Sequence, residues 1–476
     1  MPDSERPSTR RPLDLRTKIF YGLGSVAFGV KDNGFAFFLL LYYNQVLGLA
    51  EERVGFAIMV ALVADGLIDP FIGYLSDHLH SRWGRRHPFM YASALPVGLA
   101  YYFLWRPPAG LSPGALFAYL LAIAVLVRAL IACYEIPSSS LVAELTDQYD
   151  ERTSILSYRY FFGWWGGLAM AVLAYTVFLR SDPAHPTGVL NPEGYHRYGF
   201  AAAIIMVVAI LISATGTHRF IPHLRRPPAS RHAGGIVGEL RQTLANRSFL
   251  VLFAAAGFAA MASGITAALG IYFNTFFWEL SSEQIGVLAM LNFVSAAIAL
   301  AVTPVLSRRF GKKPAAIAIS LVAIAIGPLP VTLRLLGCFP ANGSPALLPT
   351  LALWSTMFVT LFIVSSILLT AMLADVVEES EITTGRRSEG VLFAANVFIQ
   401  KAVSGIGIFT SSLILGAIGF PRGAKPGAVD PTIVRNLGLV YTPLLVVLFL
   451  VSTGFVALFR IDRDTHEANL RRLSKR

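Results

Sequence analysis

Long apolar runs follow one another along nearly the whole chain, and they restrict its fold more than any other feature. They recur between residues 19 and 460. A run of about 20 residues with few charges spans a bilayer as an α-helix. A membrane β-barrel would instead show alternating segments of about 10 residues, and such segments do not dominate. We therefore expect an all-α integral membrane protein with about twelve transmembrane helices.

The composition agrees with a membrane protein and excludes several other classes. Only 14% of the residues are charged and the mean hydropathy is +0.61, whereas a soluble domain has about 25% charged residues. The net charge of +11 does not indicate nucleic-acid binding, because basic residues gather in short cytoplasmic loops of membrane proteins. The two cysteines, Cys133 and Cys338, predict neither a disulfide framework nor a metal site.

The loops between the runs predict the topology. Basic clusters such as SRWGRRH, SRRFGKK and RRLSKR mark cytoplasmic loops by the positive-inside rule. The polar N-terminal segment has no apolar core, so it is interpreted as a cytoplasmic tail and not as a cleaved signal peptide. We therefore expect a multi-pass protein of the plasma (inner) membrane with both termini in the cytoplasm.

The longest polar interruption suggests a division into two halves. It covers residues 221–247, contains Pro227 and Pro228, and leaves six predicted spans on either side. The predicted segments are a cytoplasmic tail (1–18), an N-terminal six-helix bundle (19–220), a central loop (221–247), a C-terminal six-helix bundle (248–460) and a second tail (461–476). Two homologous halves around a central cavity are typical of secondary transporters. An unsymmetric bundle with one long loop is the alternative.

Two carboxylates on one helical stripe form the first candidate site. Asp65 and Asp69 are four residues apart inside an apolar run, so they share one face. A carboxylate within a span costs about 2.5–3.5 kcal/mol on insertion scales, so each needs a partner. Paired carboxylates suit Na⁺ or a shared proton. We expect a cation-coupling site here, and a metal site only if the coupling ion is Na⁺.

Other charged residues also fall inside predicted spans, where they normally face the bundle interior and pair. They are Lys31, Asp32, Arg128, Glu135, Arg159 and Lys401. Lys31 and Asp32 point roughly 100° apart on a helix, so one lines the cavity, and Asp32 is favoured. Arg128 is interpreted as structural. Glu135 is a candidate for binding, although it could cap backbone groups freed by Pro137. Lys401, the one deep charge of the second half, is expected to reach toward the carboxylates.

A second charged pattern lies at the cytoplasmic ends of the spans. Asp375, Glu378 and Glu381 follow one another at steps of three, so they share one helical face. Basic residues of the first half, Arg152 and those of the SRWGRR loop, are expected opposite them. We interpret these groups as a candidate ionic gate, with a solvated acidic turn as the alternative. The predicted gate residues are Asp77, Arg82, Arg85, Arg86, Arg152, Asp375, Glu378 and Glu381.

Four stretches carry a resemblance to a known family. They read YGLGSVAFGVKDNGFAF, DGLIDPFIGYLSDHLHSRWGRRHP, YEIPSSSLVAELTDQYDERT and ADVVEESEITTGRRSEG with IQKAVSG. The chain resembles the glycoside–pentoside–hexuronide:cation symporters of the melibiose-carrier type, within the major facilitator superfamily. The resemblance implies two bundles with alternating access. It also implies a cation site at Asp65 and Asp69 facing Lys401.

For the solute, the resemblance implies a binding site at Asp32, Glu135 and Arg159, to which we add Lys31 as the neighbour of Asp32. Three positions depart from the family pattern. Ile68 and Ala132 stand where sodium-using members have polar side chains, and Ser139 replaces a sugar-stacking tryptophan. These departures favour H⁺ over Na⁺ and argue against a galactoside. Eukaryotic lysolipid carriers share this fold and the acids of span 2.

The sequence thus predicts a symporter, coupled to H⁺ or Na⁺, for a small polar solute such as a sugar or a glycoside. A lysophospholipid or another amphipathic solute is the alternative. The sequence contains no H-E-x-x-H or G-x-S-x-G motif, so we expect no enzyme, and scattered single charges favour a carrier over a channel. No cofactor beyond the coupling ion is expected, and the chain is expected to act as a monomer.

Overall fold

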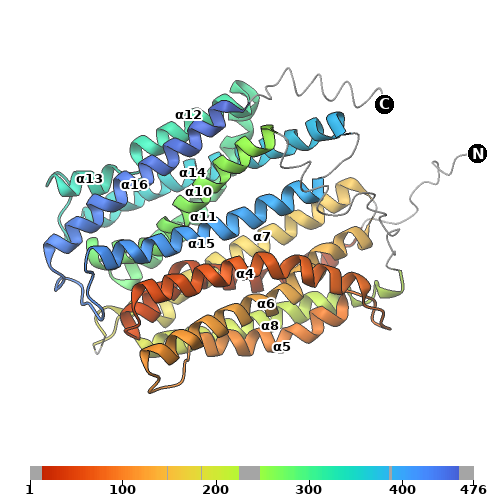
Figure 1. Cartoon of the computed structure of the whole chain (residues 1–476), viewed down its shortest axis with the longest axis horizontal. Coiled ribbons are helices and arrows are strands. Elements are labelled where there is room, and N and C mark those ends of the chain that lie inside the picture. The colour runs from red at the N-terminus through yellow and green to blue at the C-terminus, as the bar shows by residue number, and fades with distance from the viewer. Residues whose placement is uncertain (1–12, 147, 184, 224–246, 385–388, 460–476) are drawn as a thin grey trace, which may run out of the picture. The chain divides into compact units, whose positions relative to one another are not determined.

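The structure, a computed structural model, describes residues 13–146, 148–183, 185–223, 247–384 and 389–459. The regular elements within these ranges are helices, and no strand occurs among them (Figure 1). Eleven described segments are long and apolar enough to cross a membrane. Helix α5 (His87–Leu104) is not one of these eleven; it lies between the second and third of them, and counting it as a span gives twelve. The prediction of an all-α protein with twelve transmembrane helices is confirmed.

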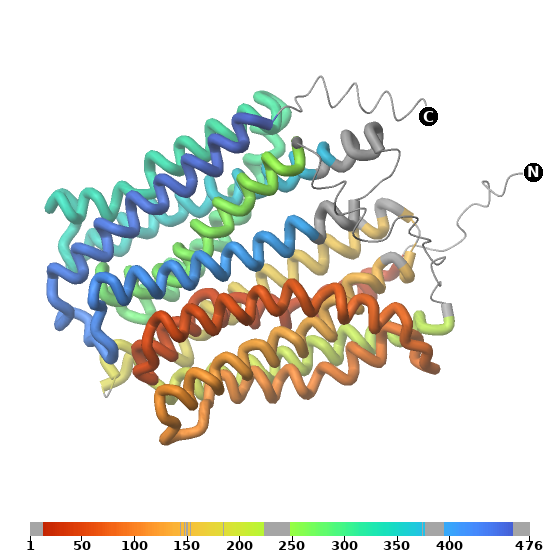
Figure 2. The backbone as a smooth tube through the Cα atoms, in the orientation of Figure 1, coloured from red at the N-terminus to blue at the C-terminus, as the bar shows by residue number. Residues whose placement is uncertain are grey.

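The chain separates into two compact units. The first contains residues 1–49 and 60–230, and the second contains residues 50–59 and 231–476. Helix α4 (Glu51–His78) therefore contributes to both, because its first residues group with the second unit. The tube in Figure 2 follows the chain through both units. The predicted central loop, 221–247, lies mostly outside the described residues.

The first unit begins with a segmented helix and continues with longer ones. The first span consists of α1 (Leu15–Leu23), α2 (Val26–Asn33), η1 (Gly34–Phe38), α3 (Leu39–Leu41) and η2 (Tyr42–Val46). After α4 and α5 follow α6 (Pro113–Leu145), α7 (Tyr149–Leu173) with η3 (Ala174–Phe178), the short η4 (Gly188–Leu190), α8 (Pro192–His218) and η5 (Ile221–His223). Helix α5 packs against both α6 and α8 (Figure 1).

Local sequence explains where these helices start. The Ser112 side chain accepts a hydrogen bond from the Ala115 N–H, and the Asn191 side chain accepts one from the Glu193 N–H. A proline follows each cap directly. Polar caps satisfy backbone N–H groups that a helix start leaves unpaired, and proline fits the first helical position.

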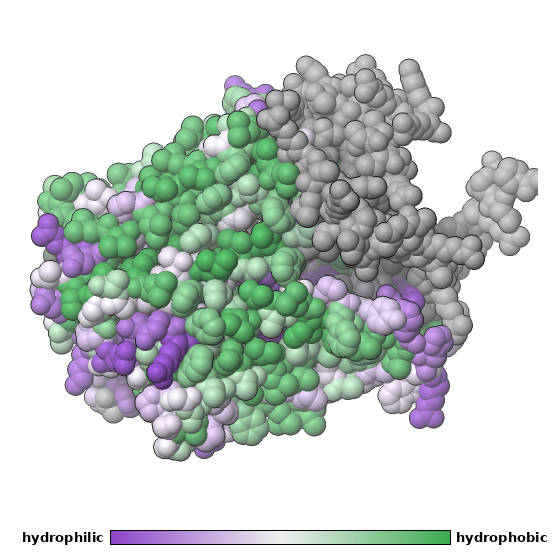
Figure 3. Space-filling view, viewed as in Figure 1, coloured by the Kyte–Doolittle hydropathy of each residue, from purple (hydrophilic) through white to green (hydrophobic). Residues whose placement is uncertain are grey.

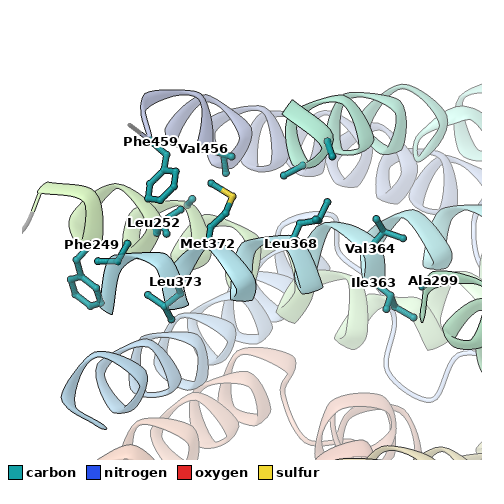
Figure 4. Close-up of a cluster of buried hydrophobic side chains, with 14 of the residues drawn as sticks. Phe249, Leu252, Ala299, Ile363, Val364, Leu368, Met372, Leu373, Val456 and Phe459 are labelled. Carbon is teal, nitrogen blue, oxygen red and sulfur yellow. The ribbon is translucent and has the colours of Figure 1, made fainter. Parts of the chain in front are cut away.

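The second unit has the same kinds of element. Its helices are α10 (Arg247–Tyr272) with η6 (Phe273–Phe277), α11 (Ser282–Phe310), α12 (Lys312–Ile326), α13 (Leu329–Leu335), α14 (Leu347–Thr384), α15 (Glu389–Ala417) and α16 (Pro431–Leu458). Side chains of α10, α14 and α16 meet in a buried apolar core, with Met372, Leu252 and Val456 close together (Figure 4). Apolar side chains also dominate the outer face shown in Figure 3.

Several details recur in both units. The Leu49 N–H donates to the Tyr43 carbonyl, and the Leu280 N–H donates to the Asn274 carbonyl. The residue before each leucine, Gly48 or Glu279, has a positive φ. Both loops that follow the next helix contain a positive-φ glycine and then two basic residues: Gly84 with Arg85–Arg86, and Gly311 with Lys312–Lys313. These shared features indicate that the two units follow one plan.

Glycines permit the closest helix contacts in each unit. A Cβ added to Gly29 of α2 would lie 2.0 Å from the Gly163 carbonyl oxygen of α7. A Cβ added to Gly264 of α10 would lie 2.2 Å from the Ser404 carbonyl oxygen of α15. Small residues let the backbones of membrane helices approach this closely. Each contact joins the first and the fifth transmembrane span of its own unit.

Candidate functional site

Asp65 lies inside the first unit and pairs with Arg128. The Arg128 Nη1 atom donates to the Asp65 Oδ2 atom over 2.9 Å, and the two side chains are only 3% and 2% exposed. The guanidinium lies 4.5 Å from the ring centroid of Phe35. Removing one partner of a buried ion pair costs about 3–5 kcal/mol, because the other charge stays buried without compensation. The ion pair therefore stabilises the packing of α4 against α6 only while both side chains are charged.

Asp69 lies one turn further along α4 and is half-buried. Lys401 is half-buried on α15, in the second unit. The sequence predicts that Lys401 faces Asp65 and Asp69. Because Lys401 belongs to the second unit and the two acids belong to the first, this arrangement stays a prediction. Arg128 was interpreted from the sequence as structural, and its direct bond to Asp65 was missed. The available signal was one deep cation on span 4 and two acids on one face of span 2.

Lys31 and Asp32 occupy very different environments although they are neighbours. The Lys31 side chain is 1% exposed, whereas that of Asp32 is 55% exposed. Their charged groups nevertheless meet, with the Lys31 Nζ atom 2.9 Å from the Asp32 Oδ1 atom. The long lysine side chain reaches out of the bundle interior to the carboxylate. Asp32 is thus the more accessible of the two, and it is the residue that the sequence analysis favoured for the solute site.

Arg159 links three helices of the first unit. Its Nη1 atom lies 3.2 Å from the Ser138 hydroxyl, and its Nη2 atom donates to the Glu135 backbone carbonyl over 3.3 Å. Its guanidinium also lies 5.1 Å from the Phe28 ring centroid on α2. The structure therefore brings Arg159 beside Glu135, as the candidate solute site requires. Within the described residues the Glu135 carboxylate makes no hydrogen bond, so its two oxygens can accept hydrogen bonds from a ligand.

The predicted gate residues of the first unit gather around an acid that sequence reasoning missed, Glu144. This buried residue at the end of α6 accepts from Nε of Arg85 over 2.9 Å and from Nε of Arg86 over 3.0 Å. Arg86 also lies 2.5 Å from Asp77. The cluster clamps the ends of α4, α5 and α6 together. The signal for Glu144 was its place in the polar stretch AELTD directly after an apolar run.

The remaining gate residues are placed differently. The exposed Arg82 lies over the Trp83 ring, and the Arg152 Nε atom donates to the Thr146 carbonyl over 2.9 Å. In the second unit, the Lys312 Nζ atom lies 2.6 Å from the Asp375 Oδ1 atom. The side chains of Glu378 and Glu381 lie outside the described residues. A gate joining the two units therefore stays a prediction.

A family model described as "MFS/sugar transport protein" matches residues 20–463 of this chain. An uncharacterized symporter of Synechocystis sp. is 26% identical, over 86% of each chain. An isoprimeverose transporter of Lactiplantibacillus pentosus is 24% identical, over 84% of this chain and 80% of the relative. A sphingosine-1-phosphate transporter of Mus musculus is 25% identical, over 89% of this chain and 84% of the relative.

The fold is also similar to that of solved transporters. The inward-open xylose transporter from E. coli superposes with a TM-score of 0.63 at 16% sequence identity. The match covers 95% of this chain and 98% of the xylose transporter. At this identity the similarity shows the fold alone.

Proposed function

Because this chain belongs to the MFS/sugar transport protein family, we propose that it is a cation-coupled symporter that carries a sugar or a glycoside by alternating access. The coarser statement, a membrane transporter of a small-molecule solute, follows from the family itself. The observation that carries the finer proposal is the buried Asp65–Arg128 ion pair inside a membrane span. The name of the isoprimeverose transporter points to the same class of solute.

The ion pair provides a coupling step. A proton that binds Asp65 removes its charge and ends the ionic attraction that holds Arg128 against α4. Arg128 then needs a new acceptor, because an uncompensated buried charge is costly. Asp69 is the nearest acid along the same helix face. Loading the cation therefore rearranges the contacts between α4 and α6.

The solute site of this proposal contains Asp32, Glu135 and Arg159. Two carboxylates accept hydrogen bonds from hydroxyl groups, and a guanidinium donates to ring or hydroxyl oxygens. Lys31 supports Asp32 through their ion pair. This donor and acceptor set suits a neutral, hydroxyl-rich molecule.

H⁺ is the favoured coupling ion. One oxygen of Asp65 is already occupied by Arg128. Ile68, next to Asp69, and Ala132, on α6, offer no oxygen ligand from their side chains. A bound Na⁺ would need several oxygens, whereas a proton needs one.

The experiment is solute uptake by purified protein in proteoliposomes, driven separately by a pH gradient and by a Na⁺ gradient. The first solutes are pentoses, hexoses and α-glycosides of xylose. We expect uptake driven by the pH gradient. Asp65→Asn should abolish gradient-driven accumulation, and Asp69→Asn should weaken it. Exchange of labelled for unlabelled solute should persist in Asp65→Asn. Accumulation by Asp65→Asn at the wild-type level would refute the proposed coupling site.

A lipid-like solute is the second candidate, and the similarity to the mouse sphingosine-1-phosphate transporter favours it. Competition distinguishes the two candidates. Xylosides should inhibit uptake of a labelled sugar, and sphingosine-1-phosphate or a lysophospholipid should not. The reverse result would assign the chain to amphipathic solutes. In either case we propose a plasma (inner) membrane location with cytoplasmic termini, which can be checked by labelling single cysteines placed in the two tails.

A further inference from the structure

The second unit contains a cavity of about 210 Å³. It lies among α10 with η6, the junction of α12 and α13, α14 and α16. Aromatic side chains provide much of its wall, including Trp278, Trp354, Phe358 and Tyr441. No charged residue lines it. Most of the wall residues keep part of their surface exposed, so the cavity is not sealed by its own walls.

A break in one transmembrane span shapes this cavity. Helix α12 ends at Ile326, and Gly327 and Pro328 separate it from α13. Pro330 has no N–H, so it cannot bond the carbonyl of Ile326, four residues earlier. The Trp354 Nε1 atom donates to the Ile326 carbonyl over 2.8 Å. The same indole stacks on Phe358 with ring centroids 5.4 Å apart, so a fixed aromatic surface faces the cavity.

In the first unit, aromatic side chains of the first, third and sixth spans pack against one another. Trp105 stacks on Tyr195 with centroids 5.7 Å apart, and the Tyr42 and Tyr195 centroids are 4.5 Å apart. By the shared turn that ends each first span, Tyr43 of the first unit corresponds to Asn274 of the second. The Tyr43 hydroxyl bonds the Leu104 carbonyl. Asn274, which has a shorter side chain, lines the cavity instead.

Three polar side chains of the cavity wall have no partner. Within the described residues, the side chains of Asn274 and Ser355 make no hydrogen bond, and the Thr442 hydroxyl is buried and unpaired. Buried polar groups are normally satisfied by protein, water or a ligand. An uncharged, mainly apolar wall with a few free hydrogen-bonding groups suits a neutral, apolar ligand that carries one or two polar atoms.

The exposed apolar residues beside the cavity indicate which kind of ligand reaches it. The wall residues alternate with strongly exposed apolar neighbours on the same membrane-spanning helices. Leu353 is 74% exposed and Met357 is 47% exposed on α14, and Val447 is 54% exposed on α16. In a bilayer such residues contact lipid hydrocarbon. We propose that this cavity binds one acyl chain of a membrane lipid, with the ester group of that chain within reach of Asn274. This site is separate from the candidate cation and solute residues of the first unit.

The test uses the full-length protein in vesicles of phosphatidylcholine that carries a diazirine at the end of one acyl chain. After illumination, labelled peptides are identified by mass spectrometry. Val446→Phe and Ser355→Phe should each fill the cavity. The matched control is Val447→Phe, which adds the same ring at the next position of α16, outside the wall.

In the wild type, we expect labelling of the α14 stretch 354–359 and the α16 stretch 441–446. Each filling variant should reduce it at least fivefold, while the control keeps it. Folding of each variant is checked by gel filtration and thermal unfolding. Two filling variants are used so that the test still stands if one of them does not fold. Labelling that is unchanged in the folded filling variants would overturn the proposal. Displacement of the label by a soluble alkyl glycoside, but not by excess unlabelled lipid, would also overturn it.

Discussion

The two units share a helical plan but differ sharply in what they bury. The first unit encloses Lys31, Asp65, Arg128 and Arg159, each with a relative exposure of 6% or less. Counted from Leu49 and from Leu280, the positions of Asp65 and Asp69 hold Ala296 and Leu300 in the second unit.

The second unit instead contains an apolar core and an open aromatic cavity. The fold itself therefore does not require charges at the positions of Asp65 and Asp69, because the matching positions of the second unit are apolar. Their cost has to be repaid by function or by mutual pairing. The comparison thus points to the first unit as the location of coupling chemistry.

The strongest test of this difference is the Asp65–Arg128 pair. Arg128→Met should lower the free energy of unfolding by about 3–5 kcal/mol, because Asp65 stays buried without its partner. Replacing both residues, as Asp65→Leu with Arg128→Met, should recover much of the loss. Thermal unfolding in detergent measures the effect. Arg334→Met, on the partly buried Arg334 of the second unit, is the control and should change little. Equal stability of Arg128→Met and the wild type would remove the energetic contrast between the units.

Glu144 of α6 and Asp375 of α14 test whether the ion pairs to the matching basic loops are equally strong in the two units. Glu144 pairs with the arginines Arg85 and Arg86, and Asp375 pairs in the matching loop with Lys312, whose side chain is 33% exposed. Glu144→Gln should cost about 1.5–3 kcal/mol, since hydrogen bonds to charged groups are lost. Asp375→Asn should cost less. The two variants are compared by thermal unfolding and by uptake at several pH values. If Asp375→Asn left transport unchanged, the predicted gate role of Asp375 would be rejected.

Glycine substitutions test the feature that both units share. Gly29→Ala and Gly264→Ala each place a methyl group against a neighbouring backbone carbonyl. Both should destabilise by about 1–3 kcal/mol, as overpacked cores do. Gly257→Ala on α10 is the matched control, because nothing lies within 4 Å of an added Cβ there. The midpoints of thermal unfolding measure the effect. If Gly264→Ala did not change stability, the two units would differ in helix packing as well as in buried charge.

The smallest expected effect lies at the edge of the first unit. The Thr17 hydroxyl and the Arg219 guanidinium both bond Asp14 and lower the pKa of its carboxyl. The charged form is stabilised, so this contribution is present above the ordinary aspartate pKa of about 3.9 and is lost as pH falls through the lowered value. The pair is exposed, so it should contribute under about 1 kcal/mol. Thermal unfolding of Asp14→Asn between pH 3 and pH 6 should differ from the wild type only in the upper part of that range.

The sequence predicted the spans well because their length and apolarity depend on the bilayer alone. Helical geometry also predicted that Lys31 and Asp32 point in different directions, but the choice of Asp32 for the solute site stays a prediction. The sequence did not identify Arg128 as the partner of Asp65, or Glu144 as the partner of Arg85 and Arg86, because a helical period gives the face of one helix and not the residue opposite. The cavity had no sequence signal at all: an empty space results from the combined shapes of several helices.

The shared membership of α4 has a mechanical consequence. Its residues 51–59 group with the second unit, while the rest of the helix, including Asp65, groups with the first. Helix α4 runs through the boundary at Met59–Val60 as one helix. If transport displaces one unit against the other, as we propose, some of the contacts of this helix have to change. Asp65 follows the boundary by less than two turns, so the buried Asp65–Arg128 pair lies next to the place where that change would occur.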